Sequence, residues 1–517
     1  MARNLLLLAS LLLTLLGKAQ QMPVDYRFGD KYNDRYKYSN LVTFSEATSG
    51  NKLLVRAYYT GLVLHPKGYL IERYDEGLQL LDEFNYKFND ADLVDGFVAN
   101  GQLYLLFLKY DPERLSYVYS VHHSPVGDYR FTQKELLVIP SVYVDSPLDK
   151  NYYNRNFTSG FSTAVLFDRD KKAFAISLHY KKGNDNRHRI LVYDFNFSPR
   201  MDVDFSKEIE EKNYAFEALE MTPDLSAAYL VGKAYFVKKR FKADERKFQY
   251  EVVRLTASGA ATASYDVDGK YSEALNPIWR NNKLICVGFY ADRKDSRYNG
   301  LEYLEIDPAT LGATRHLFNP FSEQFMYDKF GTEEEKVVKN LVFKDVWFAD
   351  DGSLLFNAEE QFVTKSIQAN ASGGRVAIER FHHNDIVSVK LNPAGELAWA
   401  RNINKTEVTQ GDGAYASYSA YTKNGNTYFF ICTSAENPQL LNNERLIFKQ
   451  GLGRNRNVFL IRLDSEGQLS YEKIIDQEEA RLPLMVSKPL VLEADDTLYF
   501  YAKRGSKKQM VAVHIQG

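Results

Sequence analysis

The stretch "VFLIRLDSEGQLSYEKI", residues 458–474, decides the fold, because it predicts two strands joined by a tight turn. Its first half is strongly apolar, its middle holds Asp, Ser and Gly, and its second half alternates more weakly. Those turn residues tolerate turn dihedral angles or bond their own backbone. The same pattern recurs along the chain, which indicates a repeat protein. The other copies lie at residues 69–84, 119–136, 190–205, 251–267, 302–318 and 385–403.

A second type of hairpin precedes these copies, with a polar "NG", "DG" or "NN" turn followed by a nearly continuous apolar strand. Examples are residues 94–108, 276–290, 344–360 and 417–433. A continuous apolar run indicates a strand that is buried on both faces. Each unit therefore predicts four strands, an inner pair and an outer pair, which is the blade of a β-propeller.

The count of units predicts an all-β fold, a single propeller of eight four-stranded blades. Seven units fit between about residues 41 and 475, and residues 488–515 supply three further strands. We expect residues 24–39 to supply the missing outer strand and close the ring. Seven blades is the alternative, if residues 41–60 form no independent hairpin. A short surface helix is expected at residues 330–341.

This arrangement resembles exported β-propellers of Gram-negative bacteria in general, across nearly the whole mature chain. The chain has no repeated WD dipeptide, no kelch double glycine and no repeated aspartate box of the sialidase type. The resemblance implies a fold and not an activity, because one fold hosts many functions.

The amino end predicts export. Arg3 precedes the apolar run 5–16, and Ala19 offers a small residue for cleavage, so residues 1–19 have the layout of a signal peptide. We expect residues 20–517 to form one domain. No segment of the mature chain has the length of a transmembrane helix without charges. The expected location is periplasmic or extracellular.

The amino-acid composition restricts the class of partner and the class of fold. The 65 basic and 67 acidic side chains nearly balance, which argues against a nucleic-acid partner. The 36 Tyr and 33 Phe favour strands. Cys286 and Cys432 fall in equivalent strands two repeats apart, farther than the ~7 Å Cα separation that a disulfide tolerates. We therefore predict two buried thiols with no disulfide between them.

Basic loops are the most informative functional feature. The loops predicted to join second and third strands are each net positive, although the acidic connections between blades share their face. Propeller geometry gathers these loops on one face, where they would attract an anionic glycan or an envelope protein. The loops are 181–189, 238–249, 291–300, 434–457 and 502–508. The predicted contact residues are Lys238, Lys239, Arg240, Lys242, Arg454 and Arg456.

The histidines predict no metal site. His382 and His383 are adjacent, and neighbouring residues of a strand point to opposite faces, so the pair does not easily share one ion with Asp385. His179 and His188 flank a long loop and are expected at the surface or the rim. No cofactor is predicted.

Catalytic signatures are also missing from the sequence. "GFSTA", residues 160–164, lacks the final glycine of a nucleophile motif, and no catalytic residue is predicted. Trp279, Trp347 and Trp399 occupy regular places in the repeat, which favours packing between blades.

The sequence thus favours a non-enzymatic, exported, monomeric propeller that binds a partner or acts as a scaffold in the cell envelope. The alternative is a propeller-type glycan hydrolase or lyase with carboxylates or histidines at the central channel. The alternative requires ionisable residues from at least three blades that converge within ~10 Å at a channel mouth, in a pocket of a few hundred Å3, whereas an apolar, plugged channel would favour the first hypothesis.

Overall fold

The fold is seen in a computed structural model that describes residues 22–516, with gaps. The gaps are residues 48–49, 60–65, 90, 142–160, 170–171, 183–184, 207–211, 237–244, 268, 293–296, 335, 370–374, 412, 443–444 and 452–456. Within the described residues the strands form eight sheets, which we number in chain order. Sheet 1 contains β3 (Tyr38–Glu46), β4 (Lys52–Tyr59), β5 (Gly68–Tyr74) and β6 (Leu80–Tyr86), and sheet 2 contains β7 (Ala91–Ala99), β8 (Gln102–Asp111), β9 (Ser116–Pro125) and β10 (Thr132–Pro140). Sheet 3 contains β11 (Phe161–Phe167), β12 (Ala173–Lys182), β13 (Asp185–Asp194) and β14 (Pro199–Asp204). Sheet 4 contains β15 (Lys212–Met221), β16 (Ala227–Phe236), β17 (Phe248–Thr256) and β18 (Gly259–Ser264).

The remaining sheets follow the same plan, with additions in sheets 6 and 8. Sheet 5 contains β19 (Tyr271–Arg280), β20 (Lys283–Ala291), β21 (Gly300–Ile306) and β22 (Ala313–Pro320). Sheet 6 contains β23 (Leu341–Phe348), β24 (Leu354–Ala369), β25 (Arg375–Leu391) and β26 (Leu397–Thr406), joined by β27 (Val408–Thr409), β30 (Gln439–Leu440) and β31 (Leu446–Lys449). Sheet 7 contains β28 (Ser419–Lys423), β29 (Asn426–Thr433), β32 (Asn457–Leu463) and β33 (Leu469–Ile475). Sheet 8 contains β34 (Leu490–Leu492), β35 (Thr497–Arg504), β36 (Lys507–Ile515), β1 (Val24–Phe28) and β2 (Tyr32–Asn33).

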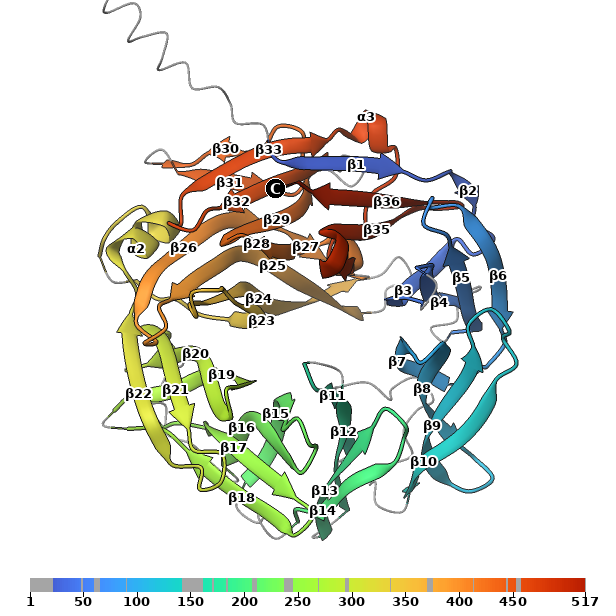
Figure 1. The fold of residues 1–517 in the computed structure, drawn as a ribbon, viewed down its shortest axis with the longest axis horizontal. Coiled ribbons are helices and arrows are strands. Elements are labelled where there is room, and N and C mark those ends of the chain that lie inside the picture. The colour runs from blue at the N-terminus through green and yellow to red at the C-terminus, as the bar shows by residue number, and fades with distance from the viewer. Residues whose placement is uncertain are drawn as a thin grey trace, which may run out of the picture.

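The sheets are arranged around a common centre (Figure 1). The first strands β3, β7, β11, β15, β19 and β23 lie nearest the centre, and the fourth strands lie at the periphery (Figure 1). Buried apolar side chains fill the spaces between successive sheets, for instance between sheets 1 and 2 and between sheets 7 and 8. The all-β propeller predicted from the repeat is confirmed.

The second strand of a sheet is buried along most of its length, as its apolar sequence predicts. All eight residues of β20 after Lys283 are buried, and so are seven of the eight residues of β29. Cys286 lies in β20 and Cys432 in β29; both are buried and neither forms a disulfide, as predicted. Burial raises the pKa of the Cys286 thiol far above its usual value, which keeps this group an apolar packing element.

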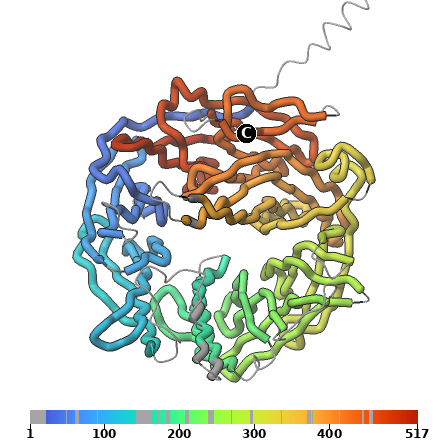
Figure 2. Tube along the Cα trace, turned by 180° about the vertical axis from the view of Figure 1, so that it is seen from behind, coloured from blue at the N-terminus to red at the C-terminus, as the bar shows by residue number. Residues whose placement is uncertain are grey.

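The two ends of the chain meet in sheet 8. β1 pairs antiparallel with β36, with Val24 opposite Ile515 and Phe28 opposite Val511, so the amino-terminal strand is the outer strand of the last sheet. Figure 2 shows the same two ends side by side from behind. The seven-blade alternative depended on residues 41–60, and within this range β3 and β4 pair antiparallel with each other.

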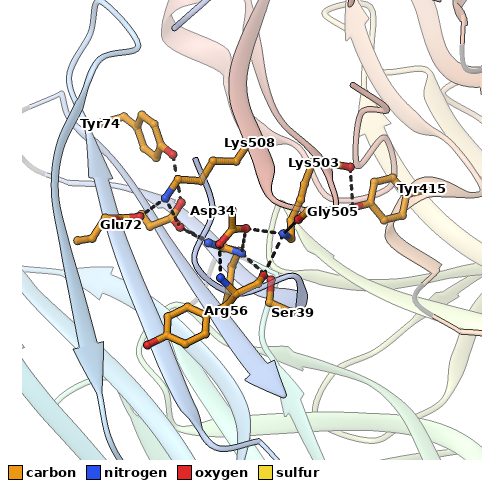
Figure 3. Close-up of polar contacts among 11 residues, drawn as sticks. Asp34, Ser39, Arg56, Glu72, Tyr74, Tyr415, Lys503, Gly505 and Lys508 are labelled. Carbon is orange, nitrogen blue, oxygen red and sulfur yellow. Dashed lines mark hydrogen bonds and ion pairs between the residues drawn. The ribbon is translucent and has the colours of Figure 1, made fainter. Parts of the chain in front are cut away.

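A buried ion cluster joins sheet 8 to sheet 1 (Figure 3). Arg56 of β4 is fully buried; its guanidinium lies 2.8 Å from an Asp34 carboxylate oxygen and also pairs with Glu72 of β5. Lys508 of β36 pairs with Glu72 at 3.0 Å, and Lys503 of β35 pairs with Asp34. Residues from both ends of the chain therefore share one set of charges.

The cluster is electrically balanced. Burial alone would raise the pKa of Glu72, but Arg56 and Lys508 outweigh it and hold that pKa below its usual value. Lys508 also pairs with Glu83, so three cations face three carboxylates. A buried charge is tolerated when it is paired in this way, whereas removal of one partner leaves an uncompensated charge.

Sheet 6 is longer than the repeat predicts. β24 and β25 have 16 and 17 residues and pair as far as Ala369 and Arg375, although the sequence predicted hairpins only at 344–360 and 385–403. β31, from the connection within sheet 7, pairs parallel with β26. The repeat could not predict this extension, because among the described residues strands of this length occur in this unit alone.

The helix prediction at residues 330–341 is wrong. α2 (Glu323–Phe330) begins after Ser322, whose hydroxyl accepts a bond from the Phe325 N–H, and ends before Gly331. Gly331 has a φ of 70°, in the left-handed region that glycine adopts readily and that ends helices. The charge spacing after Gly331 resembled a helix but lies beyond its stop signal. A single turn, α3 (Gln477–Ala480), follows β33.

Two of the predicted basic loops are also wrong. β35 ends at Arg504 and β36 begins at Lys507, so residues 502–508 form a tight hairpin and not a long loop. β12 and β13 likewise pair as far as Lys182 and Asp185 within the predicted loop 181–189. Basic strand ends resembled a loop because their lysines and arginines broke the apolar pattern.

The predicted location of His188 is wrong as well. His188 is buried, with Nε2 3.0 Å from the Ser177 hydroxyl oxygen, and aromatic rings surround it. Burial lowers its pKa to about 3, with His179 contributing. His122 is buried in sheet 2 between the hydroxyls of Tyr86 and Ser120, and burial lowers its pKa to about 4.

The predicted signal peptide, residues 1–19, lies outside the described residues. Among the helices of the described residues, none has the length and apolarity needed to cross a membrane.

Removal of Arg56 tests the ion cluster. We expect Arg56→Met to lower the free energy of unfolding by about 3–5 kcal/mol, because Glu72 and Asp34 lose a buried partner. The matched control is Arg189→Met, which breaks an exposed pair with Asp202 and should cost less than about 1 kcal/mol. Urea unfolding measures both variants, and equal losses would contradict the role given to the cluster.

Protonation of His122 tests the buried histidines. In the folded protein its pKa lies near 4 and in the unfolded chain near its ordinary value of about 6.5, so the unfolded chain binds more protons between these values. Stability should therefore fall on acidification through this window, by about 2 kcal/mol at pH 5 for this residue. We expect His122→Gln to reduce the loss of unfolding free energy between pH 7 and pH 5 by that amount. His514→Gln, at an exposed site, should leave the loss unchanged.

Candidate functional site

A cavity of about 330 Å3 lies among the inner strands of sheets 3 to 6. It is formed by the end of β11 and by parts of β15, β19 and β23, the strands nearest the centre in Figure 1. Ionisable, amide and aromatic side chains share its wall. The lining residues are Phe167, Arg169, Glu217, Ala218, Leu219, Glu220, Asn276, Pro277, Phe343, Lys344, Asp345, Val346 and Trp347.

β-Bulges in the inner strands place charged residues at this cavity. The register of β15 shifts between Phe216 and Ala218, and that of β23 between Phe343 and Asp345. Glu217 and Lys344 are the extra residues, and a bulge releases such a residue from the regular alternation. The inner strands β3, β7 and β19 carry a bulge near the equivalent place. The bulge is therefore a property of the repeat. The extra residue of β19 is also charged, but this residue, Glu273, pairs with Arg246 and is not part of the cavity lining, whereas Glu217 and Lys344 are.

Arg169 comes from the turn after β11. Asp168 is buried and fixes this turn, because its carboxylate accepts bonds from the Met221 N–H at 2.9 Å and the Lys172 N–H at 3.2 Å. The Arg169 guanidinium donates to the carbonyl of Pro277 at 3.1 Å. A side chain from sheet 3 thus reaches β19 of sheet 5.

Two glutamates of β15 are held by neighbours. Glu217 pairs with Lys233 at 3.0 Å and accepts a bond from the Tyr250 hydroxyl. Glu220 is buried, and one of its oxygens accepts the Trp279 N–H at 3.0 Å. Both carboxylates are therefore already engaged in the structure.

Lys344 belongs to a second buried set of charges. Its amine lies 3.4 Å from Glu359, which also pairs with Lys405 at 3.1 Å. Lys405 pairs in turn with Glu407 at 2.9 Å. Burial alone would raise the pKa of Glu359, but Lys405, a hydrogen bond from His383 and Lys344 outweigh it and hold that pKa well below its usual value. Two lysines and two glutamates balance one another beside the cavity.

Asp345 is the lining carboxyl with the most unusual environment. It is half-buried, and desolvation raises its pKa to about 6, with Lys344 acting in the opposite direction. Asn357 lies opposite Asp345 in the register of β24, and Ser388 lies opposite Asn357 in β25. A carboxyl with a shifted pKa in a cavity is a candidate functional group.

The sequence predicted six contact residues and no metal site. All six (Lys238, Lys239, Arg240, Lys242, Arg454 and Arg456) fall outside the described residues, so their role stays a prediction. His382 stacks on Phe362, with ring centroids 4.3 Å apart, whereas His383 lies 3.5 Å from Glu359. The described residues contain no group of three histidine, cysteine or acidic side chains placed to hold a metal ion.

The tryptophans divide into two kinds. Trp279 stacks on Tyr229 of sheet 4, with ring centroids 5.9 Å apart, and the Trp399 indole donates to the Ser465 carbonyl of sheet 7 at 3.0 Å. The predicted packing between sheets is thus confirmed for these two. Trp347 instead lines the cavity.

Sequence reasoning missed Arg169, Asp345 and the cavity itself. One signal was present: "FEALE" at 216–220 and "FKDVW" at 343–347 place an extra charged residue at the same point of the inner strand. Arg169 carried no signal, because its reach to Pro277 depends on a turn between sheets.

No family model matches the chain, and no curated protein matches it. Among solved structures, prolyl oligopeptidase B from Galerina marginata is 9% identical, with a TM-score of 0.39 and coverage of 92% of this chain and 56% of that one. Chaetomium thermophilum Sqt1, bound to the N-terminus of the ribosomal protein L10, is 9% identical, with a TM-score of 0.37 and coverage of 93% and 98%. The β-propeller domain of the Trilobed protease from Pyrococcus furiosus is 7% identical, with a TM-score of 0.35 and coverage of 86% and 98%.

The chain spans about half the length of two peptidase chains that it matches: 46% of a prolyl endopeptidase and 52% of the Pyrococcus horikoshii acylaminoacyl peptidase. These similarities are too distant to transfer an activity. The chain is an all-β propeller with a polar cavity among its inner strands.

Proposed function

We propose that this protein is an exported, non-enzymatic propeller that binds a polar ligand in the cavity among β11, β15, β19 and β23. The observation that carries the ligand site is that ionisable side chains from three different sheets line a single cavity of about 330 Å3. The enzymatic alternative requires a similar cavity, but the existing ion pairs of Glu217 and Lys344 favour a binding site. Arg169 comes from sheet 3, Glu217 from sheet 4 and Asp345 from sheet 6. A concave site with a few convergent polar groups is the usual form of a ligand site.

The existing ion pairs of the lining residues favour a binding site over a catalytic site. Glu217 and Lys344 are engaged by Lys233 and Glu359, so they are suited to hold a fixed geometry. Aromatic side chains on the same wall, Trp347 among them, offer an apolar surface to the body of a ligand.

A role in the cell envelope completes the proposal. The basic loops that contain Lys238 and Arg454 would hold an anionic glycan or an envelope protein on one face, while the cavity takes a smaller ligand. Capture of envelope partners by the tagged mature chain at low and high salt tests this part, because contacts through basic loops weaken with ionic strength. Capture that does not change with salt would contradict it.

A glycan hydrolase or lyase in the same cavity is the second candidate. Asp345 favours it, because a carboxyl with a pKa of about 6 is suited to act as a general acid near neutral pH.

Trp347 supplies the test of ligand binding. A library of small polar compounds, including amino acids, peptides and sugars, is screened against the mature protein by thermal shift. We expect Trp347→Leu to weaken binding of a hit at least tenfold, because the indole forms part of the cavity wall. Trp399→Phe is the matched control and should retain binding. Hits that bind both variants equally would contradict the cavity as the site.

Asp345 supplies the test of the enzymatic candidate. If its protonated form is the general acid, turnover of a glycan falls as pH rises through about 6, because the acid loses its proton there. Asp345→Asn should then reduce turnover at least 100-fold. Glycan cleavage that is unchanged in this variant would contradict the candidate.

A further inference from the structure

Most charged groups that line the cavity have a counter-charge or a donor. Glu217 has Lys233, Lys344 has Glu359, and Glu220 accepts a backbone N–H. These three groups therefore need no counter-charge from a ligand.

Arg169 and Asp345 differ from the others. Within the described part of the chain, the Arg169 guanidinium donates to the neutral carbonyl of Pro277 and makes no ion pair. The Asp345 carboxyl makes neither an ion pair nor a hydrogen bond with another described residue, although Lys344 is its chain neighbour. One positive and one negative group in the same cavity thus form no ion pair with another described residue.

The two groups come from different sheets. Arg169 follows β11 of sheet 3 and is carried to Pro277 of β19, whereas Asp345 belongs to β23 of sheet 6. Arg169 is exposed to solvent and Asp345 is half-buried. The wall also holds apolar side chains, including Trp347, on the same strand as Asp345.

We infer that the ligand is a zwitterion with an apolar body, of the class of a free amino acid or a short peptide. Its ammonium group pairs with Asp345, its carboxylate pairs with Arg169, and its apolar part lies against Trp347. The inference rests on the proposed binding function and names its ligand class.

Physical reasons favour this class over singly charged ligands. A charge moved out of water is tolerated when it meets an opposite charge with hydrogen bonds, and a guanidinium binds a carboxylate through two parallel bonds. A ligand with one charge would satisfy Arg169 or Asp345 and leave the other group without a counter-charge. The desolvation that raises the pKa of Asp345 would be offset by an ammonium group beside it.

The test compares a zwitterion with capped forms of the same compound. Free leucine and the dipeptide leucyl-phenylalanine are titrated into the mature protein by calorimetry, together with their N-acetyl and C-terminal amide derivatives. We expect each cap to weaken binding to the wild-type protein at least tenfold, because each removes one charge.

Two near-isosteric variants test which residue binds each end of the ligand. In Asp345→Asn the N-acetyl and free forms should bind with similar affinity, and in Arg169→Gln the amide and free forms should do so. Asp202→Asn, which removes an exposed carboxylate far from the lining set, is the matched control and should keep both differences. Near-ultraviolet circular dichroism shows whether each variant keeps the native packing.

Three outcomes would overturn the inference. Capped and free forms could bind the wild type equally, the variants could leave both differences intact, or no amino acid or peptide could bind. If a singly charged or uncharged compound binds and depends on Trp347, the binding function stands and the ligand class is wrong. If no compound depends on Trp347, the binding function fails as well.

Discussion

The ring depends on one constraint: the first and the last strands of the chain must belong to the same sheet. β1 completes sheet 8 only when Val24–Phe28 finds Lys507–Ile515, almost 500 residues away. Such a contact carries a loop-closure entropy that increases, although slowly, with the length of chain between the two strands. Buried ions lie at the junction that this pairing forms. Arg56 and Glu72 of sheet 1 meet Lys503 and Lys508 of sheet 8, and Asp34 joins them from the amino-terminal segment.

This arrangement also makes the junction specific. An apolar cluster containing Leu54 and Tyr501 lies between sheets 8 and 1, and it would tolerate small shifts of one sheet against the other. The charged residues would not tolerate such a shift, because it would leave a buried ion without its counter-charge. We therefore expect the buried ion pairs of Arg56 to restrict how the two sheets fit together, in addition to joining them.

The repeat made most of the fold predictable. Alternation and turn residues placed the outer hairpins, and the unbroken apolar runs placed the buried second strands, because both patterns follow directly from which faces meet water. The hairpin at 458–474 is β32 and β33, and the strand expected within residues 24–39 is β1. Departures from the repeat were not predictable in this way. The long arms of β24 and β25 occur in one unit, and α2 ends at Gly331 because of a local backbone preference.

The candidate site consists of such departures. A bulge on an inner strand recurs in five sheets, but only β15 and β23 place a charged residue of the cavity wall there. The repeat determines where the inner strand carries a bulge, and the sequence of the individual unit determines which side chain lies at that bulge. Arg169 shows the limit of reasoning from one repeat at a time, because its guanidinium reaches Pro277 two sheets away. In a ring of similar units, function is therefore expected where neighbouring units differ, and sheets 3 to 6 place different charges around one cavity.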